Sequence, residues 1–470
     1  MKKYILYLVI IYLIIDVSYT FIQSSTQTID GDVADIVAPS ESASYVLKDP
    51  FGYKAIVKNE FYNGPNRFFV HFSMFHYFRN VPLLLQKFFT PIDSIYISIA
   101  LFITLTLLVI VYLISSVISS FVWKDNSFFS AHKIIVMGLI FPLVHINGYN
   151  MVMGLSNTSI TYTFFYSYSM ISIILLFMPV IYAYNSSCLL VNFKNRNFLW
   201  MIPLTIICAF NGPLVPPAVI IVSLLLLTYF IIKIRQKGTT VKSIFPLILF
   251  LCFSMFLCVY SLYIGRFNSD NSWATIPILE RYMRLPIGIL SLLTNRLGLS
   301  LLIFFIGLNF YILNIKLKNL DLNSLLKWAS IFCLMYLLLL PLGGYRDYRP
   351  NIIRTDTALP LIIVIFILFG LTTCKIILKI ENKNKTKYLF FIFAFLLLNI
   401  GADSINLDNN KCEKESLKII ANSKDTIVKI QNDCNIMEWK IITVPEDSRL
   451  NGELLFYLGI TKNTKLYFQE

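Results

Sequence analysis

Apolar and polar residues alternate in long blocks along this chain. Apolar runs of about 17 to 25 residues, long enough to cross a hydrocarbon layer roughly 30 Å thick, recur along most of it. This pattern predicts about eleven membrane-spanning helices. The clear runs cover residues 97–122, 134–152, 161–184, 218–232, 244–264, 297–315, 325–342 and 358–378, and weaker runs cover 4–21, 199–210 and 388–400.

Two polar stretches interrupt the apolar pattern. The first follows the first apolar run, and it is far longer than any other gap, which is typical of a functional loop. The second is the C-terminal stretch, where short strands are predicted at 426–430, 440–444 and 465–468 with helical segments between them. We therefore predict an all-α polytopic membrane protein. Its transmembrane domain would span 1–401, including an external loop at 22–96, and a small external α/β domain would span 402–470.

Composition agrees with this class. Hydrophobic residues make up 57% of the 470 residues and charged residues only 14%, and the mean hydropathy is +0.69, which excludes an ordinary soluble protein. The net charge of +14 does not indicate a nucleic-acid partner, because the Lys and Arg residues gather in alternate connections, as the positive-inside rule requires. We predict a bacterial cytoplasmic (inner) membrane protein with a cytoplasmic N-terminus and an extracytoplasmic C-terminus.

The N-terminus has two interpretations that lead to the same topology for the loop. Lys2 and Lys3 followed by a short apolar core also describe a secretory signal peptide. The absence of a convincing small-residue cleavage site after Ser18 favours a retained helix. Either way, the loop at 22–96 is exported.

Cysteine and histidine positions indicate one disulfide and no metal motif. Cys412 and Cys434 lie in the exported tail, where a disulfide between them is plausible. Neither a CxxC nor an HExxH motif is present, and the four histidines do not have metal-ligand spacing. No cofactor is certain from the sequence, which leaves a divalent metal open.

An acidic cluster opens the first exported loop. Asp30, Asp32 and Asp35 follow the first apolar run within a few residues, with Gly31 between the first two. A carboxylate can accept the proton of an attacking hydroxyl as a general base. The alternative is an ordinary turn, because Asp-Gly is a common turn sequence. These three aspartates are the candidate catalytic residues.

Arginines gather on the same predicted face, between the last two clear apolar runs. Arg346 and Arg349 are three residues apart, Arg354 follows at the start of the next run, and Tyr345 precedes them. A guanidinium suits phosphate because its planar fork donates two parallel hydrogen bonds and keeps its charge. We predict that these four residues bind substrate. Alternatively, the arginines contact lipid headgroups or pair with Asp356 and a nearby aspartate.

A second exported charged group, Glu280 and Arg284, is a further candidate for substrate binding. Its i, i+4 spacing is also that of an ordinary salt bridge on a helix.

Carboxylates beside a phosphate-binding arginine cluster, both outside the membrane, suit glycosyl transfer from a polyprenyl-linked sugar. The donor has to arrive on a lipid, because no nucleotide sugar is expected outside. The chain resembles the C-type (GT-C) membrane glycosyltransferases in its helical core, in Asp30-Gly31-Asp32 and in the segment 344–354. The resemblance implies that Asp30 or Asp32 acts in catalysis.

The predicted function is therefore transfer of a sugar from a polyprenyl-phosphate or diphosphate donor to a glycan, lipid or protein acceptor on the extracytoplasmic face. Its predicted partners are the lipid-linked donor, that acceptor and membrane lipids. Two alternatives stay open. An O-antigen-type polymerase or ligase handles similar lipids and needs no acidic cluster, and a lipid-linked glycan flippase or transporter would move its substrate without changing it.

Overall fold

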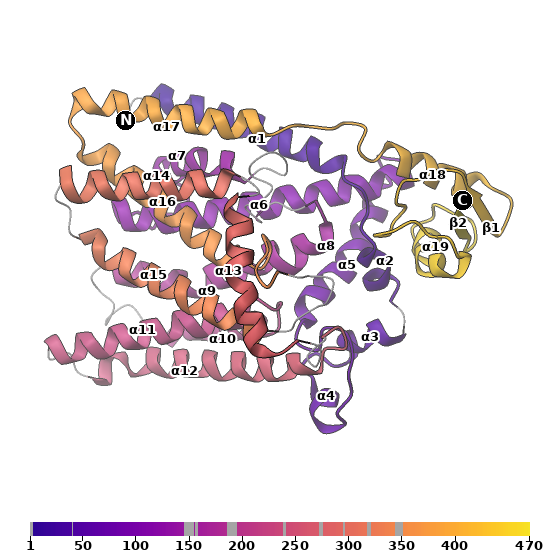
Figure 1. Cartoon of the computed structure of the whole chain (residues 1–470), viewed down its shortest axis with the longest axis horizontal. Helices are drawn as coiled ribbons and strands as arrows, with labels where there is room; N and C mark the ends of the chain where they lie inside the picture. Colours follow the sequence, from indigo (N-terminus) through magenta and orange to yellow (C-terminus); the bar gives the residue numbers. More distant parts are fainter. Residues whose placement is uncertain are drawn as a thin grey trace.

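The computed structural model describes residues 3–39, 41–144, 155, 158–185, 195–237, 241–271, 276–294, 297–316, 321–343 and 351–470. It is mostly helical with very little sheet, and the long helices run side by side along one axis (Figure 1). Within these ranges, nine helices are long and apolar enough to cross a membrane. The structure thus agrees with a polytopic helical membrane protein.

The nine spans use most of the apolar runs. They are formed by α1 (Lys3–Ser25), α6 (Pro91–Trp123), α8 (Ile160–Tyr162) with η3 (Thr163–Tyr168) and α9 (Ser169–Asn185), α11 (Val215–Lys237), α12 (Val241–Ile264) with η4 (Gly265–Phe267), α14 (Leu297–Tyr311) with η5 (Ile312–Lys316), α15 (Asp321–Leu339) with η6 (Leu340–Leu342), α16 (Leu359–Lys379) and α17 (Asn382–Ala402).

Three runs differ in length from their prediction. The run at 134–152 forms α7 (Ala131–Ile140) and η1 (Phe141–Leu143), and residues 145–154 lie outside the described part. The run at 199–210 forms α10 (Asn195–Ala209), so both helices are shorter than a span. The weak run at 388–400, in contrast, belongs to the 21-residue α17. That helix begins earlier because the Lys-rich segment before the apolar run is also helical.

Helix α6 connects the bundle to the polar loop region. It begins with Pro91 after Thr90, whose hydroxyl accepts a hydrogen bond from the Asp93 amide at 3.2 Å, a typical N-cap. It ends at Lys124, which has a φ of 56°. Its 33 residues would measure about 50 Å at about 1.5 Å per residue. Because this exceeds a hydrocarbon layer of roughly 30 Å, the first turns of α6 project beyond the bundle.

The first polar loop is helical. Its elements are α2 (Asp32–Val37), α3 (Glu41–Lys48), α4 (Tyr53–Val57) and α5 (Phe68–Leu85). Val33, Val37, Val70 and Met74 are buried in the shared core, and α2 packs against α5. The loop is therefore a folded layer on the end of the bundle.

The C-terminal residues form two helices and one small sheet. Their elements are α18 (Lys411–Asn422), β1 (Ile427–Ile430), η7 (Pro445–Ser448), α19 (Arg449–Tyr457) and β2 (Leu466–Gln469). β1 and β2 pair in parallel, with Ile427 opposite Leu466. The strand predicted at 440–444 is wrong. That segment receives two backbone hydrogen bonds, from the Gln469 amide to the Ile442 carbonyl at 2.7 Å and from the Asp447 amide to the Val444 carbonyl at 3.1 Å, and it forms no strand.

Helix α13 (Ile278–Thr294) lies across the other helices (Figure 1). One face exposes Leu279, Met283 and Ile287, whereas Arg281 and Leu285 are buried on the other. An amphipathic helix of this kind is typical of a membrane interface. The connection that the sequence indicated is thus an amphipathic helix.

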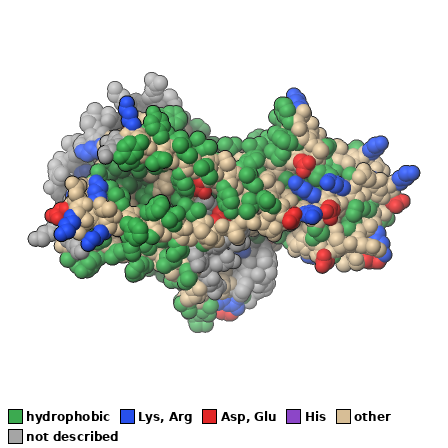
Figure 2. Space-filling model, turned by 90° about the horizontal axis from the view of Figure 1, so that it is seen from above, with side chains coloured by type: hydrophobic (Ala, Val, Ile, Leu, Met, Phe, Trp, Pro, Cys, Tyr) green, Lys and Arg blue, Asp and Glu red, His purple; other side chains and the backbone are tan. Residues whose placement is uncertain are grey.

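Charged side chains gather at the two ends of the molecule, and apolar side chains cover much of the length between them (Figure 2). We call one end the basic end, marked by Lys124, Lys233, Lys375 and Lys379. α6, α11 and α16 finish there. The opposite end, made of residues 26–66 and 403–470, is called the loop end. This separation of charge agrees with a membrane-crossing bundle, and which end faces the cytoplasm stays a prediction.

Candidate functional site

The acidic cluster lies at the loop end, at the start of α2. Asp30 precedes the helix and is buried, with 5% of its surface exposed. Asp32 and Asp35 occupy the first turn of α2 and are half-buried. The three predicted carboxylates therefore lie together but in two environments, one closed and two partly open.

Asp30 is held by the segment that begins the third span. Its carboxylate accepts hydrogen bonds from the Ser159 hydroxyl at 2.6 Å, the Thr161 amide at 3.0 Å and the Thr161 hydroxyl at 2.7 Å. The Asp32 amide donates a fourth at 3.3 Å. Burial raises the pKa of Asp30, and these hydrogen bonds oppose the rise. With both oxygens engaged, Asp30 is suited to fixing the loop in place.

Ser159 has a second task in the same turn. Its hydroxyl oxygen accepts a hydrogen bond from the Tyr162 amide at 3.1 Å and so caps α8. The π-helix η3 follows at once, and π-helical turns inside α-helices are frequent at functional sites. The start of this span is thus shaped around the Asp30 carboxylate.

Gly31 has a packing role that the turn interpretation did not include. A Cβ placed on Gly31 would lie 2.3 Å from Glu438 Oε1 and 2.8 Å from Trp439 Cδ1. The backbone at Gly31 is α-helical, with φ −68°, so the residue does not need the freedom of glycine for a turn. Instead, position 31 has no room for a side chain, because the C-terminal segment packs directly over it.

Two C-terminal carboxylates thereby join the cluster. Burial raises the pKa of Glu438, and Asp30 contributes to the rise. Glu413 is almost fully buried, and burial raises its pKa to about 7. Neither residue stands out in the sequence, because Ile29 and Gly31, which they contact, lie hundreds of residues away along the chain.

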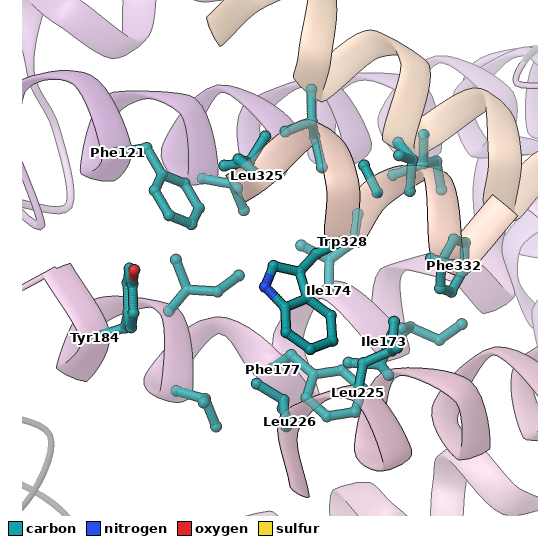
Figure 3. Close-up of a pocket in the computed structure, with 18 of the residues that line it drawn as sticks. Phe121, Ile173, Ile174, Phe177, Tyr184, Leu225, Leu226, Leu325, Trp328 and Phe332 are labelled. Atoms are coloured by element: carbon teal, nitrogen blue, oxygen red, sulfur yellow. The ribbon is translucent and has the colours of Figure 1, made fainter. Parts of the chain in front are cut away.

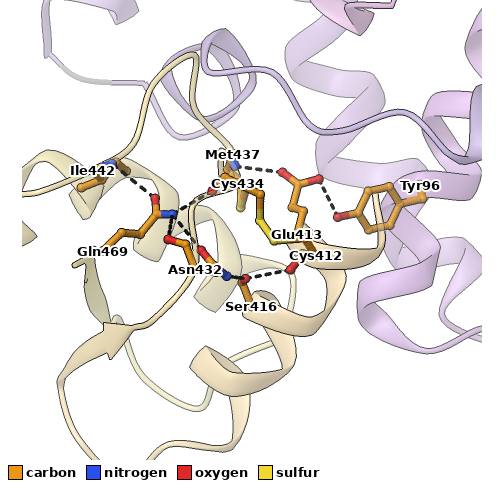
Figure 4. Close-up of a disulfide and its surroundings, with 9 residues drawn as sticks. All are labelled: Tyr96, Cys412, Glu413, Ser416, Asn432, Cys434, Met437, Ile442 and Gln469. Carbon is orange, nitrogen blue, oxygen red and sulfur yellow. Dashed lines mark hydrogen bonds between the residues drawn. A yellow bond between two sulfur atoms is a disulfide. The ribbon is translucent and has the colours of Figure 1, made fainter. Parts of the chain in front are cut away.

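Glu413 joins three segments (Figure 4). Its carboxylate accepts hydrogen bonds from the Tyr96 hydroxyl at 2.8 Å, the Ile29 amide at 3.1 Å and the Met437 amide at 2.9 Å. Tyr96 belongs to the projecting part of α6, Ile29 precedes Asp30, and Met437 precedes Glu438. One side chain thus sets the position of the acidic loop and of the C-terminal segment above it.

The predicted disulfide is present beside Glu413. Cys412 and Cys434 are joined, with their Cα atoms 6.3 Å apart (Figure 4). It connects the first turn of α18 to the segment that contains Met437. The bond therefore anchors both C-terminal carboxylates to the same helix.

Further hydrogen bonds tie the end of α1 to the C-terminal residues. The Gln23 amide donates to Asp403 at 2.8 Å, and the Asn410 amide donates to the Ser25 carbonyl at 2.9 Å. On the other side of α6, Lys414 forms an ion pair with Asp93 at 3.2 Å. The C-terminal residues are consequently docked on the first loop at several points.

Aromatic rings extend from the acidic cluster toward the bundle. The half-exposed Trp439 ring lies 5.7 Å from the ring of Tyr162, which lies 5.6 Å from that of Tyr166. Tyr162 belongs to α8 and Tyr166 to η3, so these rings extend from the acidic cluster along the start of the third span.

The predicted arginine group is described only in part. Tyr345, Arg346 and Arg349 lie outside the described residues. Arg354 is described, and its guanidinium forms an ion pair with Asp356, as the alternative interpretation expected. Asp356 also accepts a hydrogen bond from the Thr357 amide at 2.8 Å.

The Glu280 and Arg284 pair forms a salt bridge at 2.5 Å on α13, in line with its i, i+4 spacing. The buried neighbour, Arg281, makes the longer connection. Its guanidinium donates to the Ile276 carbonyl at 3.1 Å and to the Gly343 carbonyl at 3.4 Å. Arg281 thereby fixes α13 against the residue that directly precedes the arginine segment.

A buried histidine lies on the other side of η3. His71 of α5 packs its ring edge-to-face with Phe165 at 4.9 Å, and its Nε2 atom has no hydrogen-bond partner among the described residues. Burial lowers the pKa of His71 to about 3, with a smaller contribution from Arg67. His71 is therefore neutral at physiological pH and does not serve as a cationic phosphate ligand.

Within the described ranges, no three His, Cys, Asp or Glu side chains are grouped so that they could hold a metal ion. In comparisons with known proteins, the chain matches no family model, no curated protein and no solved structure.

Proposed function

We propose that this protein is a membrane glycosyltransferase that uses a sugar linked to a polyprenyl phosphate or diphosphate. The observation that carries the proposal is the grouping of half-buried Asp32 and Asp35 beside the fixed Asp30, under the exposed Trp439 and the half-buried Glu438. Carboxylates that accept hydroxyl protons, next to an aromatic ring face, suit a sugar hydroxyl as the nucleophile.

The structure supports a division of roles among the aspartates. Asp30 accepts four hydrogen bonds and is buried, so we assign it the positioning of the loop. Asp32 is half-buried and follows directly after Gly31. We therefore propose Asp32 as the general base, with Asp35 one turn later on the same helix face as its nearest substitute.

In the proposed reaction, the acceptor oxygen attacks the anomeric carbon of the donor sugar as its proton passes to Asp32. The bond between that carbon and the carrier phosphate oxygen breaks with inversion, and the electron pair leaves on the phosphate. Arg354, together with Arg346 and Arg349, is proposed to stabilise this charge. The ion pair of Arg354 with Asp356 is compatible with this role, because a guanidinium carries five N–H donors.

The proposal is tested in membranes supplied with radiolabelled lipid-linked sugars, by following a glycosylated product and free carrier lipid. We expect Asp32→Asn to lower turnover at least about 100-fold, the usual contribution of a general base, and Asp425→Asn, an exposed change in the C-terminal residues, to leave it unchanged. Full activity in both Asp32→Asn and Asp30→Asn would refute the assignment of the acidic cluster.

The alternatives give different products. A flippase would move the labelled lipid across the membrane without forming a new covalent product. A polymerase or ligase would transfer a preassembled glycan rather than a single sugar.

A further inference from the structure

Within the bundle, α6, α9, α11, α15 and α16 surround a cavity of about 550 Å³, and its lining reaches Lys375 at the basic end (Figure 3). Its walls are almost entirely apolar. Trp328 projects into the middle, with Tyr184 and Phe121 on one side and Phe332 on the other. The cavity is partly open rather than enclosed.

The cavity is long in the direction of the helices. On α16 its lining extends from Pro360 to Lys375, and on α9 from Met170 to Tyr184. Segments of this length measure about 20 Å at about 1.5 Å per residue, which is most of a hydrocarbon layer of roughly 30 Å. The lining therefore has the length and direction of an extended hydrocarbon chain that lies along the spans.

Water is a poor occupant of this space, because an apolar cavity offers it too few hydrogen-bond partners. A hydrocarbon chain would instead restore the dispersion contacts that the lining side chains lack. Trp328, Phe177 and Phe332 provide large ring surfaces for such contacts.

Positive charge lies at one end of the lining. Lys375 is the charged residue of the wall. Lys233 lies over the rings of two other lining residues, Tyr184 at 5.9 Å and Tyr229 at 5.3 Å. An ammonium group near the end of a span is placed to meet a lipid phosphate. The apolar walls suit the acyl chain of a phospholipid, and the lysines at one end of the lining suit its phosphate.

We propose that this cavity is a binding site for one chain of an anionic phospholipid from the leaflet at the basic end, with its phosphate held by Lys375 and Lys233. The proposal does not rest on the proposed glycosyl transfer, because none of Asp30, Asp32 and Asp35 lines the cavity. The bound lipid fills the space between α9 and α15 and ties α11 to α16.

The test uses the full chain in nanodiscs with lipids whose acyl chains are brominated, since bromine quenches tryptophan fluorescence on contact. The chain has five tryptophans, so a variant that keeps only Trp328 reports on the cavity. Its control keeps none of them and carries Leu334→Trp, at a position on the same helix that is exposed and does not line the cavity.

We expect brominated phosphatidylglycerol in a phosphatidylcholine bilayer to quench Trp328 half-maximally at a mole fraction about tenfold lower than it does the Leu334→Trp reporter. Unlabelled phosphatidylglycerol should reverse the quenching, and glycerol phosphate should not. Lys375→Gln should remove the tenfold preference, whereas Lys379→Gln, at the exposed end of the same helix, should keep it.

Equal quenching of the two reporters, or no quenching of Trp328, would overturn the proposal, since the cavity would then be only ordinary bilayer contact or closed to lipid. Reversal by glycerol phosphate would also overturn it, because the site would bind a free phosphate. A second variant, Ala329→Leu, adds volume within the lining. This variant should reduce the quenching of Trp328 and leave the quenching of the Leu334→Trp reporter unchanged. If Trp328 were quenched equally with and without Ala329→Leu, that result would count against the site.

Discussion

The loop end and the basic end of this molecule are held together by different forces. At the loop end, buried carboxylates accept hydrogen bonds from segments hundreds of residues apart, as Glu413 does from Ile29 and Tyr96. Between the spans that lead to the basic end, apolar side chains pack loosely enough to leave a cavity of about 550 Å³. Polar contacts require one geometry, whereas apolar contacts tolerate several. We therefore expect single substitutions to lower stability more at the loop end than at the basic end.

The largest effect is expected for Glu413→Ala. It would leave the Tyr96 hydroxyl and two backbone amides buried without an acceptor, and each such group costs about 1–3 kcal/mol. We expect the docking of the C-terminal residues to weaken by roughly 3 kcal/mol or more, measured as faster hydrogen exchange of the β1 and β2 amides.

Glu415→Ala is the matched control, because Glu415 is exposed on the same helix. Unchanged exchange in Glu413→Ala would mean that the docking does not depend on this carboxylate, and the contrast between the two ends would lose its main support.

Removal of the Cys412–Cys434 disulfide should have the next largest effect. It joins residues 22 apart, and closing a loop of about this length contributes about 3 kcal/mol in the chain-entropy model. We expect Cys412→Ser with Cys434→Ser, or a reducing agent, to make the C-terminal residues more susceptible to protease. Cys252→Ser, at an exposed position in the bundle, should leave the cleavage rate unchanged. Equal protease resistance of all three proteins would contradict the expected role.

A pH dependence should also separate the two ends. Burial raises the pKa of Glu413 to about 7 from its usual 4.5, so the folded state binds the proton more tightly than the unfolded state. This stability is fully present below pH 4.5 and is lost as pH rises through 7. Burial also raises the pKa of Asp30, which acts in the same direction.

We expect the C-terminal residues to resist protease better at pH 5.5 than at pH 8, by about tenfold or more in cleavage rate if Glu413 dominates. Glu413→Gln should reduce this dependence, because the amide does not titrate. A profile that is as steep in Glu413→Gln as in the native chain would assign the dependence to other groups.

The smallest effect is expected at the basic end. Ile174→Val removes one methylene from the cavity wall. A side chain beside a cavity has fewer packing contacts to lose, so the free energy of unfolding should fall by less than about 0.5 kcal/mol. Ile103→Val, in the fully buried part of α6, should cost about 1 kcal/mol. Thermal unfolding in detergent measures both, and a larger loss for Ile174→Val would show that the cavity wall is as tightly packed as the core.

The apolar pattern was sufficient for most of the bundle because a helix in a membrane satisfies its own backbone hydrogen bonds, and its length follows from the run. It failed where neighbouring residues decide the outcome. The predicted strand at 440–444 is rich in β-branched residues, yet β1 pairs with β2. This segment is left with hydrogen bonds to Gln469 and Asp447.

The acidic loop could be found from sequence but its surroundings could not. Asp30 and Asp32 stand out because carboxylates are rare near apolar runs. Glu413 and Glu438 are part of a polar tail in which acidic residues are common, and only the fold reveals that one is buried and the other covers Gly31. The role of Gly31 was also hidden, since close approach by a distant segment leaves no periodic signal.

The contacts of Glu413 have a consequence for the biosynthesis of the protein. The Ile29 amide, beside the acidic loop, waits for an acceptor that is 384 residues further along the chain. At roughly 5–20 residues per second, the ribosome needs about 20 to 80 s to reach it. During that interval the acidic loop has no C-terminal cover. The nascent protein therefore completes its carboxylate cluster only after Glu413 has been synthesised, so a chain truncated before this residue would lack the acceptor of the Ile29 amide.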